Sequence, residues 1–274
     1  MRLQGSVVLL TGATGGMGKA MVHELVEAGA YVIMVGRDAA ALQSLSQQHP
    51  GRLEALPADL TVAADRERVV AHMQGCQGFN LLINAAGINH FALFDQQSEQ
   101  QIMDLISVNV TASLLITRAL LPLLRRVPQA CVVNVGSSFG SIGYPGFAAY
   151  CATKFALRGF SEALRRELSD THVGVLYLAP RATRTTMNSA AVEEMNAALG
   201  VSMDNPVKVA RALINALQRD LQEVHLGFPE KILVRLNGLL PGVIHRALRK
   251  QLPVIRRFAQ TEPSTKNLAV EKSL

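Results

Sequence analysis

Short apolar runs alternate with amphipathic segments along most of this chain, and this alternation restricts the folds that it can adopt. The apolar runs are rich in Val, Ile and Leu, as expected for strands buried on both faces of a sheet. The segments between them repeat apolar residues at the spacing of one helix face. The predicted strands cover residues 6–10, 31–35, 53–56, 80–83, 130–135, 173–178 and 224–226. The first predicted helix ends near residue 28, and the others cover about 39–48, 62–74, 98–126, 149–169 and 206–220.

Repeated strand–helix units predict an α/β fold, with a doubly wound parallel sheet and helices on both faces in three Rossmann-type layers. Local signals support the helix boundaries: Ser98 and Gln101 read as a capping box, and Asn205-Pro206 as an N-cap followed by a first-turn proline. No linker or composition shift divides this region. We therefore predict one domain over residues 1–228 and a C-terminal extension over residues 229–274.

The turn between the first strand and the first helix has the glycine pattern of a phosphate-binding loop. It reads TGATGGMG over residues 11–18, with glycine at 12, 16 and 18. Glycines allow backbone N–H groups to approach a pyrophosphate at the positive end of the helix dipole. The strand–turn–helix context favours a dinucleotide site over the alternative, a flexible surface loop.

The end of the second predicted strand bears on the choice of cofactor. An acidic residue there usually holds the ribose hydroxyls of NAD, whereas an arginine accommodates the 2′-phosphate of NADP. The chain has Gly36-Arg37-Asp38 at this place. Arg37 favours NADP(H), and a one-residue shift that brought Asp38 forward would favour NAD(H).

Other polar and small residues follow predicted strands at the sheet edge where ligands of such folds bind. Asp59 follows the third strand and either binds the ligand or caps the next helix. Asn84-Ala85-Ala86-Gly87 ends the fourth strand with small residues that admit a cofactor. Asn109 lies among apolar neighbours in a predicted helix, where it is either a structural tie or part of a proton path.

Tyr150 and Lys154 are four residues apart in a predicted helix, with Ser137 upstream. This spacing places tyrosine and lysine on one helix face, one turn apart. A lysine ammonium beside a phenol favours the phenolate, so we expect Lys154 to lower the pKa of Tyr150 towards that of a general acid or base.

Taken together, these motifs resemble the short-chain dehydrogenase/reductase family in its single-domain form, over about residues 5–228. The resemblance implies that Tyr150 exchanges a proton with a carbonyl or alcohol substrate, that Lys154 holds the nicotinamide ribose and that Ser137 hydrogen-bonds the substrate oxygen. It also implies that Asn109 holds a water in a proton relay. The predicted cofactor-binding residues are Gly12, Thr14, Gly16, Met17, Gly18, Arg37, Asp59, Leu60, Asn84, Ala85, Ala86, Gly87, Tyr150, Lys154, Pro180, Thr183 and Thr185.

One position departs from the family pattern. Pro180 is followed by Arg181, where the family usually has glycine, and this puts the local backbone conformation in doubt. Arg181 and Arg184 either reach cofactor phosphates or an anionic substrate group, or are solvated loop arginines.

Residues 183–205 correspond to the family's variable substrate lid, and their methionines suit a lipophilic substrate or core packing equally.

Composition and charge limit the cellular setting. Residues 1–229 carry 18 Lys and Arg against 18 Asp and Glu, whereas residues 230–274 carry nine against three. The balanced body gives no reason to expect nucleic-acid binding.

The chain start lacks the features of a signal peptide, and no uncharged apolar run approaches the roughly 20 residues of a transmembrane helix. Three cysteines without metal-type spacing favour a cytoplasmic protein with no metal site.

The extension is basic and amphipathic, and we expect Pro241 and Pro253 to break it into short helices. Residues 229–258 either contact a membrane peripherally, pack on the protein, roof the substrate pocket or join an oligomer interface.

The leading hypothesis is an NADP(H)-dependent oxidoreductase acting on a carbonyl or secondary alcohol, lipophilic or acyl-type, as a homo-dimer or homo-tetramer. The alternatives are an NAD-preferring alcohol dehydrogenase and a non-catalytic dinucleotide-binding sensor or scaffold.

Overall fold

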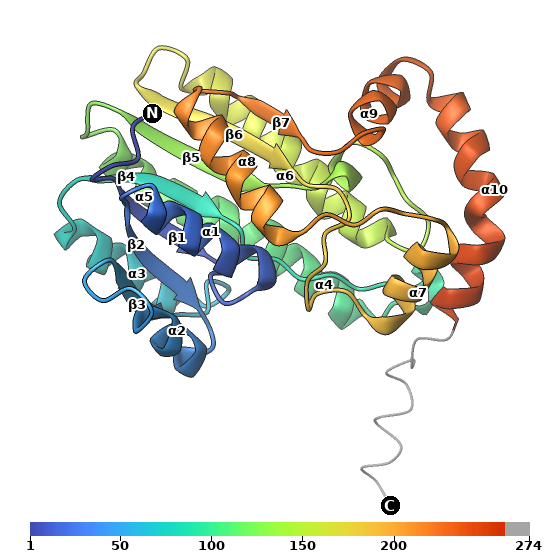
Figure 1. Cartoon of the computed structure of the whole chain (residues 1–274), viewed down its shortest axis with the longest axis horizontal. Coiled ribbons are helices and arrows are strands. Elements are labelled where there is room, and N and C mark those ends of the chain that lie inside the picture. The colour runs from blue at the N-terminus through green and yellow to red at the C-terminus, as the bar shows by residue number, and fades with distance from the viewer. Residues whose placement is uncertain (261–274) are drawn as a thin grey trace, which may run out of the picture.

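The computed structural model describes residues 1–260 and has one seven-stranded sheet, in which every neighbouring pair of strands is parallel (Figure 1). The strand order is β3-β2-β1-β4-β5-β6-β7. The predicted doubly wound α/β fold is confirmed. The strands are β1 (Val7–Thr11), β2 (Tyr31–Gly36), β3 (Leu53–Pro57), β4 (Phe79–Asn84), β5 (Ala130–Val135), β6 (Val173–Ala179) and β7 (Glu223–His225).

Helices cover both faces of the sheet because successive strand residues point to opposite sides. On one side, Val8 and Leu10 of β1 pack with α1 (Gly16–Glu27), α2 (Ala39–Ser46) and α8 (Pro206–Gln218). On the other side, Leu9 packs with α3 (Ala63–Gly75), α5 (Ala112–Leu124) and α6 (Ala148–Glu167). Each strand is therefore buried on both faces, which explains its continuous apolar run.

Strand order reverses between β1 and β4, because the chain first builds outward to β3 and then crosses back. After these two strands the chain runs to opposite faces of the sheet, to α1 on one face and to α5 on the other. In sheets of this type, ligands bind in the crevice that this separation creates. The glycine turn after β1 and the Ala85–Gly87 segment after β4 both lie at this edge.

The predicted helix over 98–126 is interrupted. The Ser98–Gln101 capping box opens α4 (Glu99–Ile106), as expected, and a π-helical segment, Ser107–Thr111, separates α4 from α5. The whole stretch Glu99–Leu124 is long and apolar enough, by length and composition, to cross a membrane, a possibility that the sequence prediction missed. Its residues Ile116, Leu120 and Leu124 are fully buried against the sheet, as in a core helix.

The described part of the C-terminal extension contains α9 (Glu230–Leu239) and α10 (Pro241–Ala259), which lie at one flank of the molecule outside the helices that cover the sheet (Figure 1). Residues 261–274 of the predicted extension lie outside the described residues. Pro241 begins α10, but Pro253 lies inside it without ending it, so the prediction that both prolines break the stretch was wrong. Pro253 and Arg249, one turn before it, are both exposed. Water can therefore satisfy the Arg249 carbonyl, whose helical donor the proline removes.

The inner side of the extension packs on the protein body. Ile255 and Ala259 of α10 are buried with Val192 and Met195 of α7 (Ala190–Ala198). Ile244 packs with Val234 of α9 and with Ile142 of the body. Packing, one of the alternatives left open by the sequence, is therefore observed for one face of these helices.

Candidate active site

The glycine turn adopts the close backbone approach that its sequence predicts. Gly12 has φ +70°, and a Cβ atom there would lie 2.7 Å from the Ala86 nitrogen. Thr11 Oγ1 accepts hydrogen bonds from the nitrogens of Ala85 (3.0 Å) and Ala86 (3.1 Å). A threonine at the end of β1 thus ties the turn after β1 to the segment after β4. Sequence reasoning did not single out Thr11.

A cleft opens above this turn, at the carboxyl edge of the sheet. Most of the predicted cofactor-binding residues line it, and it also takes in residues of the π-helical segment. The predicted residues that line the cleft are Gly12, Thr14, Gly16, Met17, Gly18, Arg37, Asp59, Leu60, Ala85, Ala86, Gly87 and Thr185.

Arg37 and Asp38 have different surroundings. Arg37 is exposed and lines the cleft. Asp38 is the N-cap of α2, where its Oδ1 accepts a hydrogen bond of 2.9 Å from the Ala41 nitrogen. The carboxylate that would have favoured NAD is therefore used in capping a helix.

Asp59 does not cap α3, whose N-cap is Val62. Its Oδ1 accepts from both the nitrogen (2.9 Å) and the hydroxyl (2.7 Å) of Thr61. Burial raises the pKa of Asp59, but the hydrogen bonds from Thr61 and the charge of Arg37 outweigh it and hold the pKa below its usual value. The Asp59 side chain is thus an ionised carboxylate in the wall of the cleft, which Arg37 also lines.

Asn84 is a correction to the predicted cofactor-binding set. Its side chain is buried and does not line the cleft. Nδ2 donates to Thr117 Oγ1 and Asn134 Oδ1, both at 2.9 Å, and Asn134 donates to Ser161 Oγ at 2.8 Å. This chain of polar groups joins β4 and β5 to the helices behind them, so the Asn84 side chain has a structural role.

Asn109 lies in the π-helical segment and is fully buried. Its Oδ1 accepts from the Ile88 nitrogen at 2.8 Å, and its Nδ2 donates to the Ile88 oxygen at 3.0 Å and to Thr153 Oγ1 at 3.1 Å. The structural tie is therefore observed. A Cβ atom at Gly87 would lie 3.3 Å from Asn109 Oδ1 and 3.7 Å from Lys154 Nζ, so the tie adjoins the lysine. The predicted water relay stays a prediction.

Tyr150 and Lys154 lie one turn apart in α6, as predicted. Lys154 Nζ lies 5.6 Å from the centroid of the Tyr150 ring and donates to the Val135 oxygen at 3.1 Å. Ser137 follows β5 as the N-cap of a single 3-10 turn, Ser138–Gly140, and its side chain is hydrogen-bonded to Tyr150. The structure thus brings Ser137, Tyr150 and Lys154 together.

The direction of the Tyr150 pKa differs from the sequence prediction. Burial raises it above its usual value, and this outweighs the opposite effect of the hydrogen bond with Ser137. Burial also lowers the pKa of Lys154 to about 8. The Lys154 ammonium donates its hydrogen bond to the Val135 carbonyl. For both Tyr150 and Lys154, burial has the largest effect on the pKa. Tyr150 is therefore a neutral phenol at physiological pH, the form that can donate a proton.

Replacing the buried lysine is expected to change how stability depends on pH. Because the folded-state pKa of about 8 lies below the ordinary 10.5, the cost of burying the charge is fully present below pH 8 and disappears as the pH rises towards 10.5. Relative to Lys154→Met, the wild-type protein should gain about 2 kcal/mol of unfolding free energy between pH 7 and pH 10. Urea unfolding of both proteins at the two pH values measures this, and an unchanged difference would contradict a desolvated Lys154.

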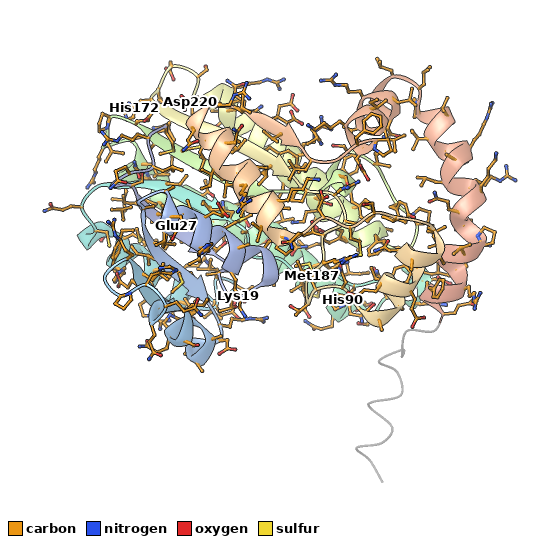
Figure 2. The ribbon with its side chains drawn as sticks, in the orientation of Figure 1. Lys19, Glu27, His90, His172, Met187 and Asp220 are labelled. Carbon is orange, nitrogen blue, oxygen red and sulfur yellow. The ribbon has the colours of Figure 1, made fainter. Side chains whose placement is uncertain are left out.

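A second cavity of about 300 Å³ adjoins the cleft and contains Ser137 and Tyr150 in its wall. Aromatic and aliphatic side chains from the body, the predicted lid and both C-terminal helices form most of the remaining surface. Met17, Asn89, Thr185 and Met187 line the cleft and the cavity alike, so the two spaces meet there. Figure 2 labels Met187 and also His90, another residue that lines the cleft. The apolar lining from the body, lid and extension includes Phe139, Tyr144, Phe147, Val192, Met195, Leu233, Ile244 and Leu248.

Two further predicted residues lie on the loop after β6. Pro180 and Thr183 line the cavity, together with Thr185. Thr183 is buried, and its hydroxyl donates to the Arg181 oxygen at 2.8 Å. A Cβ atom at Gly16 would lie 3.0 Å from the Thr185 Cβ, so this loop packs directly on the glycine turn.

Tyr177 is a supporting residue that sequence reasoning missed. It is 1% exposed in β6, and its hydroxyl donates to the Ser137 oxygen (3.3 Å) and accepts from the Ser137 nitrogen (3.4 Å). It thereby fixes the backbone of Ser137. A tyrosine among the Val and Leu residues of a buried strand is the signal that could have drawn attention to it.

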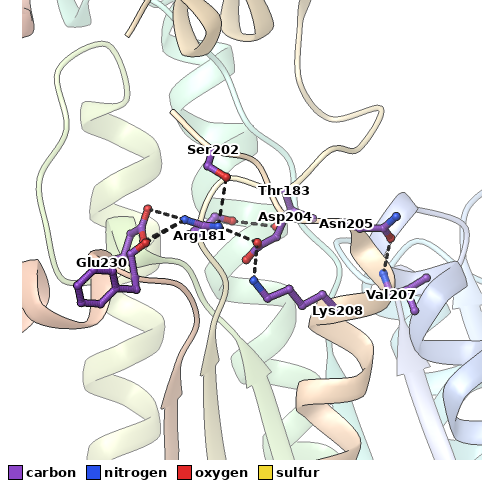
Figure 3. A network of polar contacts seen from close by, with 9 residues as sticks. Arg181, Thr183, Ser202, Asp204, Asn205, Val207, Lys208 and Glu230 are labelled. Atoms are coloured by element: carbon purple, nitrogen blue, oxygen red, sulfur yellow. Dashed lines mark hydrogen bonds and ion pairs between the residues drawn. The ribbon is translucent and has the colours of Figure 1, made fainter. Parts of the chain in front are cut away.

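Arg181 is the centre of a network of polar contacts (Figure 3). Its guanidinium pairs with Asp204 at 2.9 Å and with Glu230 at 3.3 Å, and it also reaches Ser202 and the Phe228 oxygen at 3.4 Å. The side chain is 11% exposed. Arg181 is therefore not a solvated loop arginine, because its charge is paired within the protein. It also lines the cavity that contains Ser137 and Tyr150, and its contact with an anionic substrate group stays a prediction. Arg184 is exposed.

The loop conformation accommodates an arginine. Among residues 1–260, Asp220 is the only non-glycine residue with a positive φ, so position 181 does not require glycine. Asp204 is 5% exposed and also pairs with Lys208 at 2.8 Å. Burial raises the pKa of Asp204, but the hydrogen bonds from Arg181 and Lys208 outweigh it and keep the pKa below its usual value.

Comparisons with known proteins agree with this geometry. The family model described as short chain dehydrogenase matches residues 6–196. The bovine protein "Dehydrogenase/reductase SDR family member 7B" (Bos taurus) is 30% identical over 263 residues, which cover 90% of this chain and 81% of the relative. "3-oxoacyl-[acyl-carrier-protein] reductase FabG" of Vibrio cholerae is 31% identical over 199 residues, covering 72% of this chain and 82% of the relative.

Solved structures share the fold. A short-chain dehydrogenase from Streptomyces avermitilis is 31% identical, with a TM-score of 0.77 and coverage of 92% of this chain and 98% of that one. Other similar structures were solved with NAD, NADPH, NADP or NADH bound.

Proposed function

This chain belongs to the short-chain dehydrogenase family, and from that premise we propose that it transfers hydride between NADP(H) and the carbonyl or secondary alcohol of a lipophilic, acyl-type substrate. The observation that carries this proposal is the meeting of two spaces. The cleft over the glycine turn opens, at Met17, Asn89, Thr185 and Met187, into an apolar cavity that contains Ser137 and Tyr150. A cofactor in the first space and a substrate in the second would meet beside the tyrosine.

The residues of the cleft fit a nicotinamide dinucleotide. The glycine turn offers backbone N–H groups at the start of α1, which suit a pyrophosphate. The backbone at Gly12 and Ala86 approaches so closely that a side chain at Gly12 would fill the space. When bound, the nicotinamide would supply or accept the hydride. Lys154 would hold the ribose next to it.

The protein's own groups would manage the proton and the developing charge. In the reducing direction, neutral Tyr150 would donate its phenolic proton to the substrate oxygen as that oxygen gains negative charge. Ser137 would donate a hydrogen bond to the same oxygen and stabilise this charge. Tyr177 would keep Ser137 in place through its backbone. In the oxidising direction, Tyr150 would accept the proton.

A preference for NADP(H) is supported by the two side chains that follow β2. Arg37 is free to face the cleft, whereas Asp38 caps α2. We expect Arg37→Ala to lower kcat/KM for NADPH by about 10- to 100-fold, since a charge-assisted phosphate contact is worth about 1.5–3 kcal/mol. The value for NADH should change little. Steady-state kinetics with both cofactors measure this.

Arg118→Ala is a matched control, because Arg118 is an exposed arginine on α5 that does not line the cleft. It should leave both cofactor values unchanged. Equal use of NADPH and NADH by the wild-type protein would contradict the NADP(H) assignment and support the NAD-preferring alternative.

An acyl-type substrate is supported by the apolar cavity and by the similarity to FabG of Vibrio cholerae. The experiment that tests the function is NADPH oxidation against a panel of 3-oxoacyl thioesters, aliphatic ketones and aldehydes. Increasing turnover with acyl chain length is the expected result. Cofactor binding without turnover of any member would instead favour a dinucleotide-binding sensor or scaffold. A homo-oligomeric, cytoplasmic protein is also part of the proposal, and light scattering of the purified protein tests the oligomer.

A further inference from the structure

The two C-terminal helices have an outer surface that their packing on the body leaves uncovered. Its apolar part, called the apolar tip here, extends from the first turn of α9 to the junction of α9 with α10. The tip residues are 48–80% exposed, although large apolar side chains are usually buried. The apolar tip consists of Ile232, Leu239, Leu240 and Val243.

The same helices carry charge of one sign. Residues 231–260 contain seven Lys and Arg and no Asp or Glu. The acid that begins α9, Glu230, is already paired with Arg181. All seven basic residues are exposed. They are Lys231, Arg235, Arg246, Arg249, Lys250, Arg256 and Arg257.

Helical spacing places the basic residues beside the apolar tip. Ile232 and Leu239 are seven residues apart and share one face of α9. Val243, Arg246 and Lys250 follow at i, i+3 and i+7, so they share one face of α10. Apolar side chains at one end and cations along the same face match a bilayer interface, where apolar groups enter the acyl boundary and cations meet anionic headgroups.

We propose that α9 and α10 form a docking surface for an anionic lipid bilayer. The charge argues against a second copy of this chain as the occupant. In a two-fold dimer each partner presents the same patch, so basic residues would face basic residues without any acid of these helices to neutralise them. The apolar tip argues against a nucleic-acid phosphate backbone, which offers nothing for it to contact.

Docking by this surface would bring the substrate cavity close to the bilayer. Ile244, Ala247 and Leu248 of α10 line the cavity, on the helix whose opposite side carries Arg246 and Lys250. A lipophilic substrate could then pass between bilayer and cavity along a short route. This consequence rests on the proposed function, whereas bilayer binding itself does not.

The test is co-sedimentation of the full chain with vesicles of phosphatidylcholine, alone or mixed with phosphatidylserine, without cofactor or substrate. We expect binding to the anionic vesicles that weakens as salt is raised, because screening shortens the reach of the charges. Arg246→Gln with Lys250→Gln should lower the partition coefficient by roughly fivefold per residue. Leu239→Ser with Leu240→Ser should lower it by about tenfold or more.

Matched controls separate the surface from general effects of charge and exposure. Arg125→Gln with Arg126→Gln removes two exposed arginines after α5, and Met103→Ser removes an exposed apolar residue of α4. Neither control should change vesicle binding. No binding to anionic vesicles at low salt would overturn the proposal. So would binding that the tip variants leave unchanged, or a concentration-dependent dimer that the tip variants abolish. Since no turnover is measured, a failed reductase assay would leave this result unaffected.

Discussion

A Tyr150→Phe variant is expected to lose turnover by about 10²- to 10⁴-fold, the usual contribution of a positioned general acid. The change removes only the hydroxyl. The ring can keep its edge-on contacts with Phe139 and Phe147, whose centroids lie 6.4 Å away. Cofactor binding should therefore persist, and the free energy of unfolding should change by less than about 1 kcal/mol. Single-turnover reduction and NADPH fluorescence titration measure the two effects separately.

Tyr144→Phe is the matched control for this variant. Tyr144 lines the same cavity, and its hydroxyl donates to Gln251 of α10 at 3.0 Å. Losing this hydroxyl removes a contact in the cavity wall without touching the reacting oxygen. A change in KM with kcat nearly unchanged is expected. If Tyr150→Phe kept near-normal turnover, Tyr150 would not be the proton donor and the site assignment would fail.

The largest effect on stability is expected at Arg181. Arg181→Ala removes one of the two cationic partners of a carboxylate that is 5% exposed, and Lys208 remains as the other, so we expect a cost of about 1–3 kcal/mol for the lost charged hydrogen bond. The contact of Arg181 with Glu230 is lost as well. Since Asp204 lies in the predicted lid and Glu230 in α9, the variant removes the side chain that links these two segments. Urea unfolding measures the cost. Arg184→Ala, at an exposed arginine of the same loop, should change stability by less than about 0.5 kcal/mol.

The same variant should change the acid dependence of stability. The pKa of Asp204 is held below its usual value, so its contribution is present above the ordinary pKa of 3.8 and is lost as the pH falls below it. Without Arg181 this loss should be smaller. A double variant, Arg181→Ala with Asp204→Asn, should be less destabilised than the sum of the two single changes. Additive costs, or a cost equal to that of Arg184→Ala, would contradict a buried pair.

Features that depend on local sequence could be predicted. The strands appear as continuous apolar runs because the sheet is covered on both faces, and the capping box and the Tyr150–Lys154 spacing are local patterns. The glycine turn needs only the residues around it. These patterns led to a fold and a family that were confirmed. The catalytic roles of Ser137, Tyr150 and Lys154 stay predictions.

Features that depend on distant partners could not be predicted. Arg181 meets Asp204 and Glu230, which lie 23 and 49 residues away, and no spacing rule pairs them. Asn84 was taken for a cofactor ligand because its side-chain partners, Thr117 and Asn134, come from other elements. The pKa of Tyr150 was misjudged in direction because the extent of burial follows from the whole fold. Pro253 was expected to end a helix that other contacts hold together.

The contact between Tyr177 and Ser137 also limits which sequences can evolve at this site. A Cβ atom at either Gly136 or Gly140 would overlap the buried phenol of Tyr177. These three positions therefore constrain one another across β5, β6 and the 3-10 turn. A larger residue at Gly136 becomes acceptable only after Tyr177 has been replaced by a shorter side chain, and that replacement releases the backbone of Ser137. At Gly140 a Cβ atom would also lie 2.7 Å from the Lys154 carbonyl oxygen, so a shorter residue 177 does not open that position. Residues 136 and 177 are therefore expected to covary among homologues, whereas residue 140 is expected to stay glycine whatever residue 177 is.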